Sequence, residues 1–436
     1  MRFRSATRKG VVTSQELENR LKQAVKKKAE IEKKYRETNQ RFWTLLFIDL
    51  TSSSRPMWGK QENEGGKILT TYQQLTRTAL EEKGAAFIEP GGGTQVLAAF
   101  EDPSAALTAA EAVLWILEEW NTGKPEYADL RPAIGVHQGF VNFFGGTIHQ
   151  SNTSNMAKRI QSEAKPGQIL VSSVIYEALQ NDPRFEFRFA GTYSLKNIPE
   201  PQDIYQASHG NPQTNPFGFV PAGMTCSFDA VVVPNQEFQT YQWAFVYIDV
   251  CESTRKFWKY GDQQAGRLIQ DYQKLCHETF TACGSCYVKS CDGDQIIATF
   301  ELDDIDSAAV SSIKILKDLF RRNVNFPPTK HIRAAIGIHC GEVVIHGDEL
   351  VQTQDMCIGK AIQSQALADE ILLSVDAARL LDPEILQYVA EYGLCQFPGI
   401  SEPRELRTLK WFHASLRPSL LYPSRKKSPR FKSLYR

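Results

Sequence analysis

Two aspartates of this sequence, Asp249 and Asp294, have the spacing expected of a metal-dependent phosphoryl-transfer site. Asp249 ends the apolar run WAFVYID, and Asp294 follows a glycine in KSCDGDQIIATF, 45 residues later. Carboxylates that converge from separate strands can hold two divalent cations beside a phosphate group. The turn Glu252-Ser253-Thr254 follows and offers backbone amides to the anion. The first aspartate also has a simpler interpretation, because an Asp before Ser or Thr often only caps the next helix.

A second pair, Asn155 and Arg159, could act on the sugar and the phosphate of such a substrate. The two residues are four positions apart and are therefore expected on one face of a helix. An arginine there can neutralise charge that develops on a transferring phosphoryl group, and an asparagine can orient a sugar. Such pairs are also common on protein surfaces, so by itself this pair weighs little.

An internal repeat must position these residues. Three blocks recur in the same order about 200 residues later: FWTLLFIDLTSSSR at 42–55 as WAFVYIDVCESTR at 243–255, RPAIGVHQGFV at 131–141 as RAAIGIHCGEV at 333–343, and IQSEAKPGQILVS at 160–172 as IQSQALADEILLS at 362–374. Each copy alternates β-branched or aromatic runs with helical segments, such as Ser104–Trp120 and Asp306–Arg321, which predicts helices packed on a sheet. The segment 208–240 between the copies is rich in Pro, Gly, Asn and Gln, which is typical of a linker.

The two copies have lost complementary parts of the site. In copy one, Thr94 replaces the hairpin carboxylate, so that Asp49 lacks its partner. In copy two, Cys357 and Ala361 replace the Asn/Arg pair and can do neither job. The carboxylates of copy two and the Asn/Arg pair of copy one would together complete one site, although two losses are few enough for chance.

The composition is that of a globular protein with two or three domains: 436 residues, 42% hydrophobic and 23% charged. Fifty basic residues balance fifty acidic ones, which argues against a nucleic-acid partner. No run approaches the roughly 18 apolar residues of a membrane span, and no secretory signal is present. All nine cysteines lie from Cys226 onward without disulfide-scaffold spacing, so we expect a cytoplasmic protein without an integral membrane segment.

Both ends of the chain are basic. Residues 1–41 hold 13 Lys or Arg against 5 Asp or Glu, and a charged helix is expected there from Ser14 to about Gln40. The last segment, 414–436, is a basic tail. Both ends are expected to be solvated segments rather than contacts to a membrane surface or a polyanion.

Taken together, these motifs resemble the class III adenylyl/guanylyl cyclase catalytic domain. The resemblance rests on the strand ending in Asp, the Gly-Asp hairpin, IG-x-H-x-G, and Asn-x-x-x-Arg ahead of AKPGQILVS, and it covers domains at 42–207 and 241–413. It implies an α+β fold of two ferredoxin-like domains that pair head to tail, within one chain, as a pseudo-dimer. A monomer would then suffice, as in mammalian membrane adenylyl cyclases with one working and one degenerate site.

The resemblance also assigns roles. It implies that Asp249, Asp294 and the backbone carbonyl of Ile248 bind two Mg²⁺ or Mn²⁺ ions. One ion would activate the ribose 3′-hydroxyl for attack on the α-phosphate, and the other would hold the triphosphate until pyrophosphate leaves. Asn155 would position the ribose and Arg159 would stabilise the transition state, giving a 3′,5′-cyclic monophosphate for a downstream effector.

Lys196, in SLKNIPEP, could provide another contact to the triphosphate. It is equally well explained as a surface lysine that precedes a turn and binds no ligand.

The chain departs from the family at the base. The two polar positions with which purine cyclases read the ring correspond to Pro90 and Ile148, and Glu89, one residue away, could substitute if the hairpin carries a bulge. A site built to hydrogen-bond one base discriminates strongly through those groups. Their absence favours another base, and the chain is similar in this to bacterial pyrimidine cyclases that make cyclic UMP or CMP in antiphage signalling. A purine cyclase and a non-catalytic, nucleotide-binding pseudo-cyclase remain the alternatives.

Overall fold

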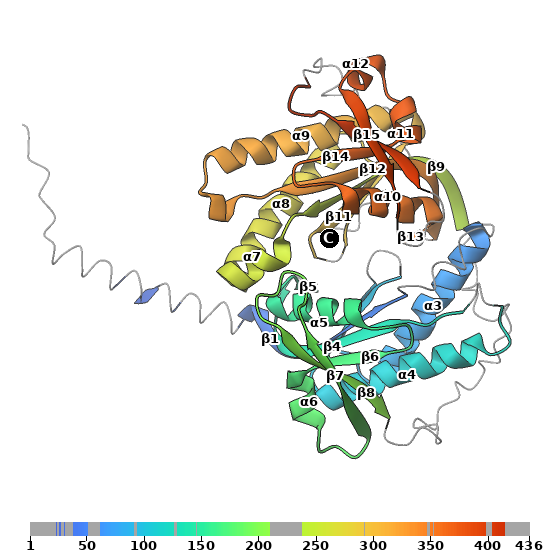
Figure 1. Cartoon of the computed structure of the whole chain (residues 1–436), viewed down its shortest axis with the longest axis vertical. Helices are drawn as coiled ribbons and strands as arrows, with labels where there is room; N and C mark the ends of the chain where they lie inside the picture. Colours follow the sequence, from blue (N-terminus) through green and yellow to red (C-terminus); the bar gives the residue numbers. More distant parts are fainter. Residues whose placement is uncertain are drawn as a thin grey trace, which may run out of the picture.

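The computed structural model describes residues 38–50, 62–90, 94–125, 129–144, 146–209, 238–291, 293–346, 349–351, 353–397 and 403–414, together with Gln23, Lys26, Lys27 and Glu30. These residues build two eight-stranded sheets, each packed against helices (Figure 1). The first sheet has the strand order β2-β3-β1-β4-β6-β8-β7, and the second repeats it as β10-β11-β9-β12-β14-β16-β15. The α+β class predicted from the sequence is therefore confirmed.

The elements of the two domains correspond one to one through most of their length. The first domain contains β1 (Gln40–Asp49), α3 (Glu62–Glu82), β2 (Phe87–Pro90), β3 (Val96–Phe100), α4 (Pro103–Asn121), β4 (Ala133–Phe144), β5 (Thr147–His149), α5 (Asn152–Glu163), β6 (Ile169–Ser172), α6 (Ser173–Leu179), β7 (Phe185–Tyr193) and β8 (Gln202–His209). The second contains β9 (Phe238–Val250), α7 (Ser253–Tyr260), α8 (Asp262–Ala282), β10 (Tyr287–Cys291), β11 (Gln295–Glu301), α9 (Ile305–Val324), β12 (Ala334–His346), β13 (Glu349–Val351), α10 (Gln354–Gln365), β14 (Ile371–Ser374), α11 (Val375–Arg379), α12 (Pro383–Leu386), β15 (Val389–Cys395) and β16 (Arg404–Leu409), with short 3₁₀ turns before α9 and β12. The inner order β2-β3-β1-β4 is that of a ferredoxin-like βαββαβ unit.

Strand β1 illustrates how the apolar run at the start of each repeat builds two cores. Successive side chains of a strand point to opposite faces of the sheet. Leu46 packs in the large cluster beneath α3 and α4, whereas Leu45 packs with Ala157 of α5 on the other face. A sheet covered on both faces needs a continuous apolar strand, and it places the polar residue that ends the strand at the edge of the core.

The Ile-Gly-x-His block has a packing role in both domains. A Cβ at Gly135 would lie 2.2 Å from the backbone nitrogen of Gln161, and one at Gly337 would lie 2.4 Å from that of Gln363. Only glycine therefore lets α5 and α10 pack this closely on their sheets. The histidine two residues on has a structural role as well: the half-buried His137 bonds to Ser172 Oγ at 2.8 Å through Nδ1, and desolvation lowers its pKa to about 4.

The two domains touch along a seam where α7 of the second packs on α5 of the first (Figure 1). Trp258 of α7 joins a cluster of first-domain residues that includes Met156 and Leu195. The Asn152 N–H donates to Asp262 at 2.9 Å, and the Asn152 side chain donates to the carbonyl of Phe257 at 3.4 Å. We call this contact between α5 and the α7–α8 corner the seam.

Several predicted segments can be compared with the structure. Helices α4 and α9 confirm the predicted helices at 104–120 and 306–321. Of the helix predicted at 14–40, the residues Gln23, Lys26, Lys27, Glu30, Thr38 and Asn39 are helical, and Gln40 already begins β1. The rest of that helix, most of the linker and nearly all of the basic tail lie outside the described residues.

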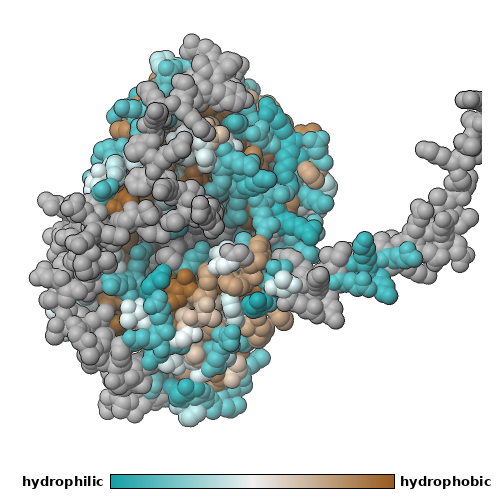
Figure 2. Space-filling model, turned by 180° about the vertical axis from the view of Figure 1, so that it is seen from behind, coloured by the Kyte–Doolittle hydropathy of each residue, from teal (hydrophilic) through white to brown (hydrophobic). Residues whose placement is uncertain are grey.

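The back of the molecule is hydrophilic over much of the described second domain, while apolar surface gathers on the first (Figure 2). The first domain exposes an aromatic pair, Phe42 of β1 and Phe140 of β4, whose ring centroids are 5.1 Å apart.

Candidate functional site

Two carboxylates meet where β9 ends and the β10–β11 hairpin turns. Strands β9 and β11 are antiparallel, with Ile248 opposite Ile296, so the register brings Asp249 and Asp294 to the same end of the sheet. Gly293 occupies the turn with φ +88°, a conformation that favours glycine. Asp294 is 6% exposed and hydrogen-bonds to Asp249. The structure thus brings together the carboxylates that the sequence predicts as a pair.

The environment of Asp294 is unfavourable for an isolated charge. Burial raises the pKa of Asp294 well above its usual range, and the neighbouring charge of Asp249 raises it further. A hydrogen bond from Ser253 and the charge of Lys158 oppose the shift. The Oδ2 atom of Asp294 is buried and has no hydrogen-bond partner. A divalent cation fits these donors, since it would neutralise both carboxylates and ligate the unpaired oxygen.

The first domain supplies Asn155 and Arg159 from α5. Ser151 caps this helix through a reciprocal bond with Ser154, which fixes where its first turn begins. Arg159 donates from Nη2 to Thr254 Oγ1 at 3.2 Å, and Thr254 donates to Asn155 Oδ1 at 3.5 Å. The predicted pair therefore lies on one helix face and contacts the second domain.

The guanidinium of Arg159 also lies in the field of the two carboxylates. Burial lowers the pKa of Arg159. The charges of Asp294 and Asp249 act in the opposite direction and partly offset this shift. The half-site of the first domain and that of the second are thus electrostatically coupled across the seam.

Several unpaired polar atoms lie along the seam. The buried side-chain atoms without a hydrogen-bond partner include Asp294 Oδ2, Asn155 Nδ2, Arg159 Nε, Gln150 Oε1, Asn152 Oδ1 and Trp258 Nε1. Each such atom costs about 1–3 kcal/mol when nothing replaces its bond to water. Three donors and three acceptors left unpaired by the two domains at one place indicate a site for a polar ligand.

The three residues of the predicted turn after Asp249 differ in their surroundings. Glu252 adopts a left-handed conformation with φ 57°, and its exposed side chain pairs with Arg255 at 3.3 Å. Ser253 and Thr254 begin α7 and are buried, and their hydroxyls serve the carboxylate and the Asn/Arg pair. Of the three, only the two hydroxyl residues are brought into contact with the other site residues by the bonds described here.

The other predicted substrate contacts lie around this centre. Glu89 follows Phe87 by two positions on β2, and Phe87 packs on the α5 face of the sheet, so Glu89 lies on that same face. Ile148 is 8% exposed and belongs to the core beneath α5, which removes it from any polar contact with a base. Lys196 is exposed in the turn whose neighbours Leu195 and Ile198 pack against the Trp258 cluster.

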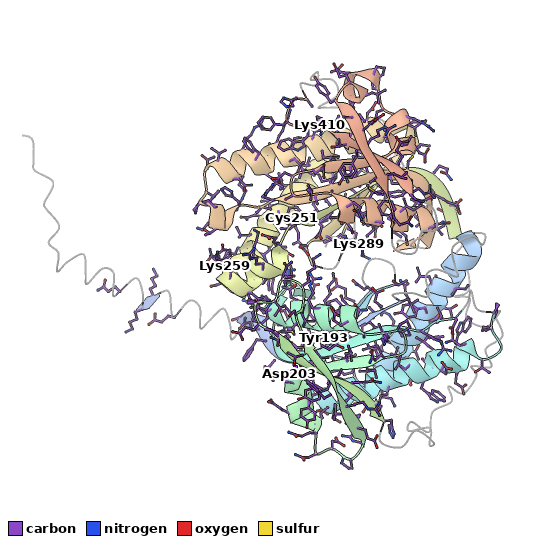
Figure 3. The ribbon with its side chains drawn as sticks, viewed as in Figure 1. Tyr193, Asp203, Cys251, Lys259, Lys289 and Lys410 are labelled. Atoms are coloured by element: carbon purple, nitrogen blue, oxygen red, sulfur yellow. The ribbon has the colours of Figure 1, made fainter. Side chains whose placement is uncertain are left out.

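Sequence reasoning missed four seam residues: Gln150, Asn152, Trp258 and Asp262. Burial raises the pKa of Asp262 to about 6, and the hydrogen bond from the Asn152 backbone lowers it in part. An apolar tryptophan amid charged residues in STRKFWKY is the one signal that could have pointed to a docking residue. In Figure 3, Lys259 marks α7 at the seam, Cys251 marks the end of β9, Lys289 marks β10, and Tyr193 and Asp203 mark β7 and β8 of the first domain.

The corresponding positions of the first repeat are satisfied within the protein. Thr94 donates from its hydroxyl to Asp49 Oδ1 at 2.5 Å, and Gln95 Nε2 lies 3.4 Å from Oδ2. In the second repeat, Ala361 of α10 packs against a small apolar cluster, and Cys357 lies on the same helix, half-buried. Neither pair offers the unpaired buried atoms that the seam offers.

The family model described as the adenylate and guanylate cyclase catalytic domain matches residues 39–208. The first domain belongs to this family. A receptor-type adenylate cyclase of Trypanosoma brucei brucei, GRESAG 4.3, is 24% identical to this chain over 203 aligned residues, with 37% of this chain and 16% of that protein covered. Receptor-type adenylate cyclase A of Leishmania donovani is 23% identical over 203 residues, 37% of this chain and 15% of that protein. The matched part thus spans about a sixth of these relatives.

The fold of both domains together also has a solved counterpart. A protein from Pseudomonas aeruginosa, described as class III adenylyl cyclase-like and ATP-binding, superposes with a TM-score of 0.52 at 10% identity and covers 80% of this chain and 86% of that one. This similarity shows a common fold. No helix in the described part of the chain is long and apolar enough to cross a membrane.

Proposed function

We propose that the chain is a nucleotide cyclase that converts a ribonucleoside triphosphate to a 3′,5′-cyclic monophosphate and pyrophosphate at one composite site on the seam. The observation that carries this proposal is the set of unpaired buried atoms, Asp294 Oδ2 from one domain and Asn155 Nδ2 and Arg159 Nε from the other. An acceptor suited to a cation lies beside two donors suited to sugar and phosphate oxygens. A metal-bound triphosphate satisfies all three.

In this proposal, domains at 42–207 and 241–413 pair head to tail within a single chain, and a monomer is complete. Asp249, Asp294 and the carbonyl of Ile248 hold two divalent ions, Mg²⁺ or Mn²⁺. When bound, these ions supply Lewis-acid activation of the ribose hydroxyl and charge neutralisation on the phosphates.

The protein's own groups orient the substrate. Asn155 donates from Nδ2 to the sugar, which holds the 3′-oxygen near the α-phosphate. Arg159 already lies in the field of the two carboxylates and would stabilise the charge that develops on the phosphate during transfer. We propose that the amides at the start of α7 receive the triphosphate, with Lys196 as a further contact.

The base is the part of the substrate that the site restricts least. Burial of Ile148 in the core leaves one purine-reading position without a polar group, and proline occupies the other. Glu89 is the polar group on the correct face of the sheet. We therefore propose a pyrimidine product, cyclic UMP or CMP, used as an antiphage signal that a downstream effector binds; a purine product is the alternative.

Incubation of the purified protein with Mn²⁺ and each of ATP, GTP, CTP and UTP, followed by mass analysis for cyclic monophosphates, tests this function. One cyclic product establishes the cyclase and identifies the base. Product from ATP or GTP alone would replace the pyrimidine proposal by the purine one. No product from any of the four, with folded protein, would contradict catalysis.

A nucleotide-binding regulator without turnover is the second candidate. The Pseudomonas aeruginosa protein that shares the two-domain fold is described as ATP-binding, and this supports a binding role. Equilibrium binding of each triphosphate with and without Mn²⁺ separates the two candidates, because a binder retains metal-dependent affinity while forming no product.

A further inference from the structure

Gln150 lies where the two half-sites meet. It connects β5 to the capped first turn of α5, five residues before Asn155. Its side chain is half-buried and contacts both domains. In the second domain it contacts Ser253 and Gly293, which flank the Asp249 and Asp294 carboxylates.

Both hydrogens of the Gln150 amide are engaged. Nε2 donates to Asn155 Oδ1 at 3.0 Å within the first domain and to Ser253 Oγ at 3.4 Å across the seam. A side-chain amide nitrogen carries two N–H groups, so these bonds use its full donor capacity. Oε1 remains as a buried acceptor without a partner.

This contact determines which end of the Asn155 amide is available. Asn155 Oδ1 accepts from Gln150 and from Thr254, whereas Nδ2 is buried without a partner. The oxygen and nitrogen of a carboxamide exchange places when the group rotates by half a turn. A donor placed on the oxygen by Gln150 therefore presents Nδ2, a donor, to the substrate.

The same side chain contacts the hairpin that carries Asp294. A Cβ at Gly293 would lie 3.3 Å from Gln150 Cβ, so the two residues are in packing contact. Ser253 accepts from Gln150 and donates to the Asp294 carboxylate. Gln273 holds the hairpin from behind by donating to the Gly293 carbonyl at 2.5 Å. Gln150 thus bridges the sugar-binding helix and the carboxylate hairpin.

We propose that Gln150 is a positioning residue of the composite site: it orients the Asn155 amide with its nitrogen toward the ribose of the triphosphate, and through Ser253 and Gly293 it keeps that amide aligned with the carboxylate hairpin. This inference rests on the proposed cyclase function and specifies which group of Asn155 meets the sugar. Gln150 acts through Asn155 and forms no part of the reacting set.

The sharpest test is Gln150→Glu, which keeps the shape of the side chain but removes both donors. The introduced carboxylate can only accept, so the Asn155 amide should rotate and turn Nδ2 toward it, leaving an oxygen opposite the ribose. We expect kcat/KM to fall by about 10–100-fold, as for a misoriented substrate. Gln150→Ala removes the donors without adding a charge, so its kcat/KM should fall by a smaller factor. Gln352→Glu, five residues before Cys357 in the second repeat, is the matched control and should change kcat/KM less than about twofold.

A double-mutant cycle with Asn155→Ala shows whether Gln150 acts through Asn155. Residues that act as a unit are not additive, so Gln150→Glu should cost less than about twofold in the Asn155→Ala background. A merely structural role would lower the thermal midpoint and reduce kcat/KM equally in both backgrounds. Equal losses in both backgrounds, or full activity of Gln150→Glu, would overturn the inference.

The cycle also separates failure of this inference from failure of the proposed function. If the wild type forms no cyclic product, the cyclase proposal fails, and the same four proteins are then compared by Mn²⁺-dependent binding of the 3′-deoxy analogues of ATP, GTP, CTP and UTP. Weaker binding by Gln150→Glu in the wild-type background alone supports the positioning role. Equal binding by all four proteins, or no binding by the wild type, overturns it.

Discussion

The two repeats differ in the charges and hydrogen-bond partners at the same pair of strand-end positions. In the second repeat, Asp249 and Asp294 lie together, and one buried carboxylate oxygen has no partner. In the first, the hydroxyl of Thr94 donates to Asp49, and Gln95 lies near its other oxygen. A buried carboxylate beside a second carboxylate needs a cation or a proton, whereas an aspartate with two neutral donors is satisfied by the protein alone. This difference is why we propose that the metal ions bind at the second repeat.

The helices that follow show the opposite difference. Helix α5 presents Asn155 and Arg159 with unpaired atoms toward the seam. At the same positions α10 carries a cysteine and an alanine, and Ala361 packs in an apolar cluster. In each repeat, one of the two sets of positions carries the polar groups of the proposed site, and the other set carries residues satisfied by packing or hydrogen bonds within the protein. If only one repeat carried its polar groups, its charges or donors would have no counterpart in the other domain.

The largest effect is expected from Asp294→Ala compared with Asp49→Ala. Loss of the buried metal carboxylate should reduce turnover by several orders of magnitude. Loss of Asp49 removes a residue that already has two neutral donors, so turnover should change by less than about tenfold. Steady-state rates of cyclic product formation with Mn²⁺ measure both. Equal damage from the two variants would contradict the assignment of the metal ions to the second repeat.

Next in size is Arg159→Ala, which removes the half-buried guanidinium whose charge interacts with both carboxylates. We expect kcat to fall by about 10²–10³-fold, the range found when one charge-stabilising donor is removed. Arg321→Ala, on an exposed arginine of α9 that pairs with Asp318, serves as control and should leave kcat unchanged. A loss confined to KM would mean that Arg159 binds the ground state instead.

Thr94→Asp sharpens the comparison by rebuilding a carboxylate pair in the first repeat. The variant should lose about 1–3 kcal/mol of stability without metal, because it buries a second charge beside Asp49. Mn²⁺ should then raise its thermal midpoint by more degrees than it raises that of the wild type. Calorimetric scans with EDTA and with Mn²⁺ measure both quantities, and Asp294→Asn should show the reverse, with a smaller Mn²⁺ effect. Identical Mn²⁺ responses in all three proteins would refute the comparison.

The smallest effect concerns a buried acidic residue of the first domain. The second domain has no acidic residue at the corresponding position. Alignment of SAAL with SAAV places Glu111 of α4 opposite Lys314 of α9. Burial raises the pKa of Glu111 to about 8, with the charge of Arg184 opposing, and neither carboxylate oxygen has a partner. The folded chain therefore retains this proton between about pH 4.5 and 8 while the unfolded chain releases it, so this group's contribution to stability falls as the pH rises through that range.

Glu111→Gln removes that dependence. At pH 8.5 the variant should be more stable than the wild type by at least about 1 kcal/mol, and at pH 5 the two should be nearly equal. Urea unfolding at the two pH values measures the difference, and Lys314→Gln is the control. A variant that is less stable than the wild type at both values would show that the Glu111 carboxylate has a partner in solution.

The helix and strand predictions succeeded where the pattern is local. The apolar runs that end in Asp49 and Asp249 became β1 and β9, and the alanine-rich and mixed apolar segments became α4 and α9. The Asn/Arg spacing placed both residues on α5, because four positions make about one helical turn. The roles of these residues in catalysis remain predictions, and so do the domain boundaries.

The sequence alone was enough for the repeat, the α+β class and the complementary losses, because periodicity and residue identity are local properties. The packing of α7 on α5 arose only in three dimensions. Contacts such as Gln150 with Ser253, or Arg159 with Thr254, join residues about 100 positions apart. They depend on how the surfaces of two domains fit and on which side chains fill the space between them, and no spacing along one chain encodes that fit.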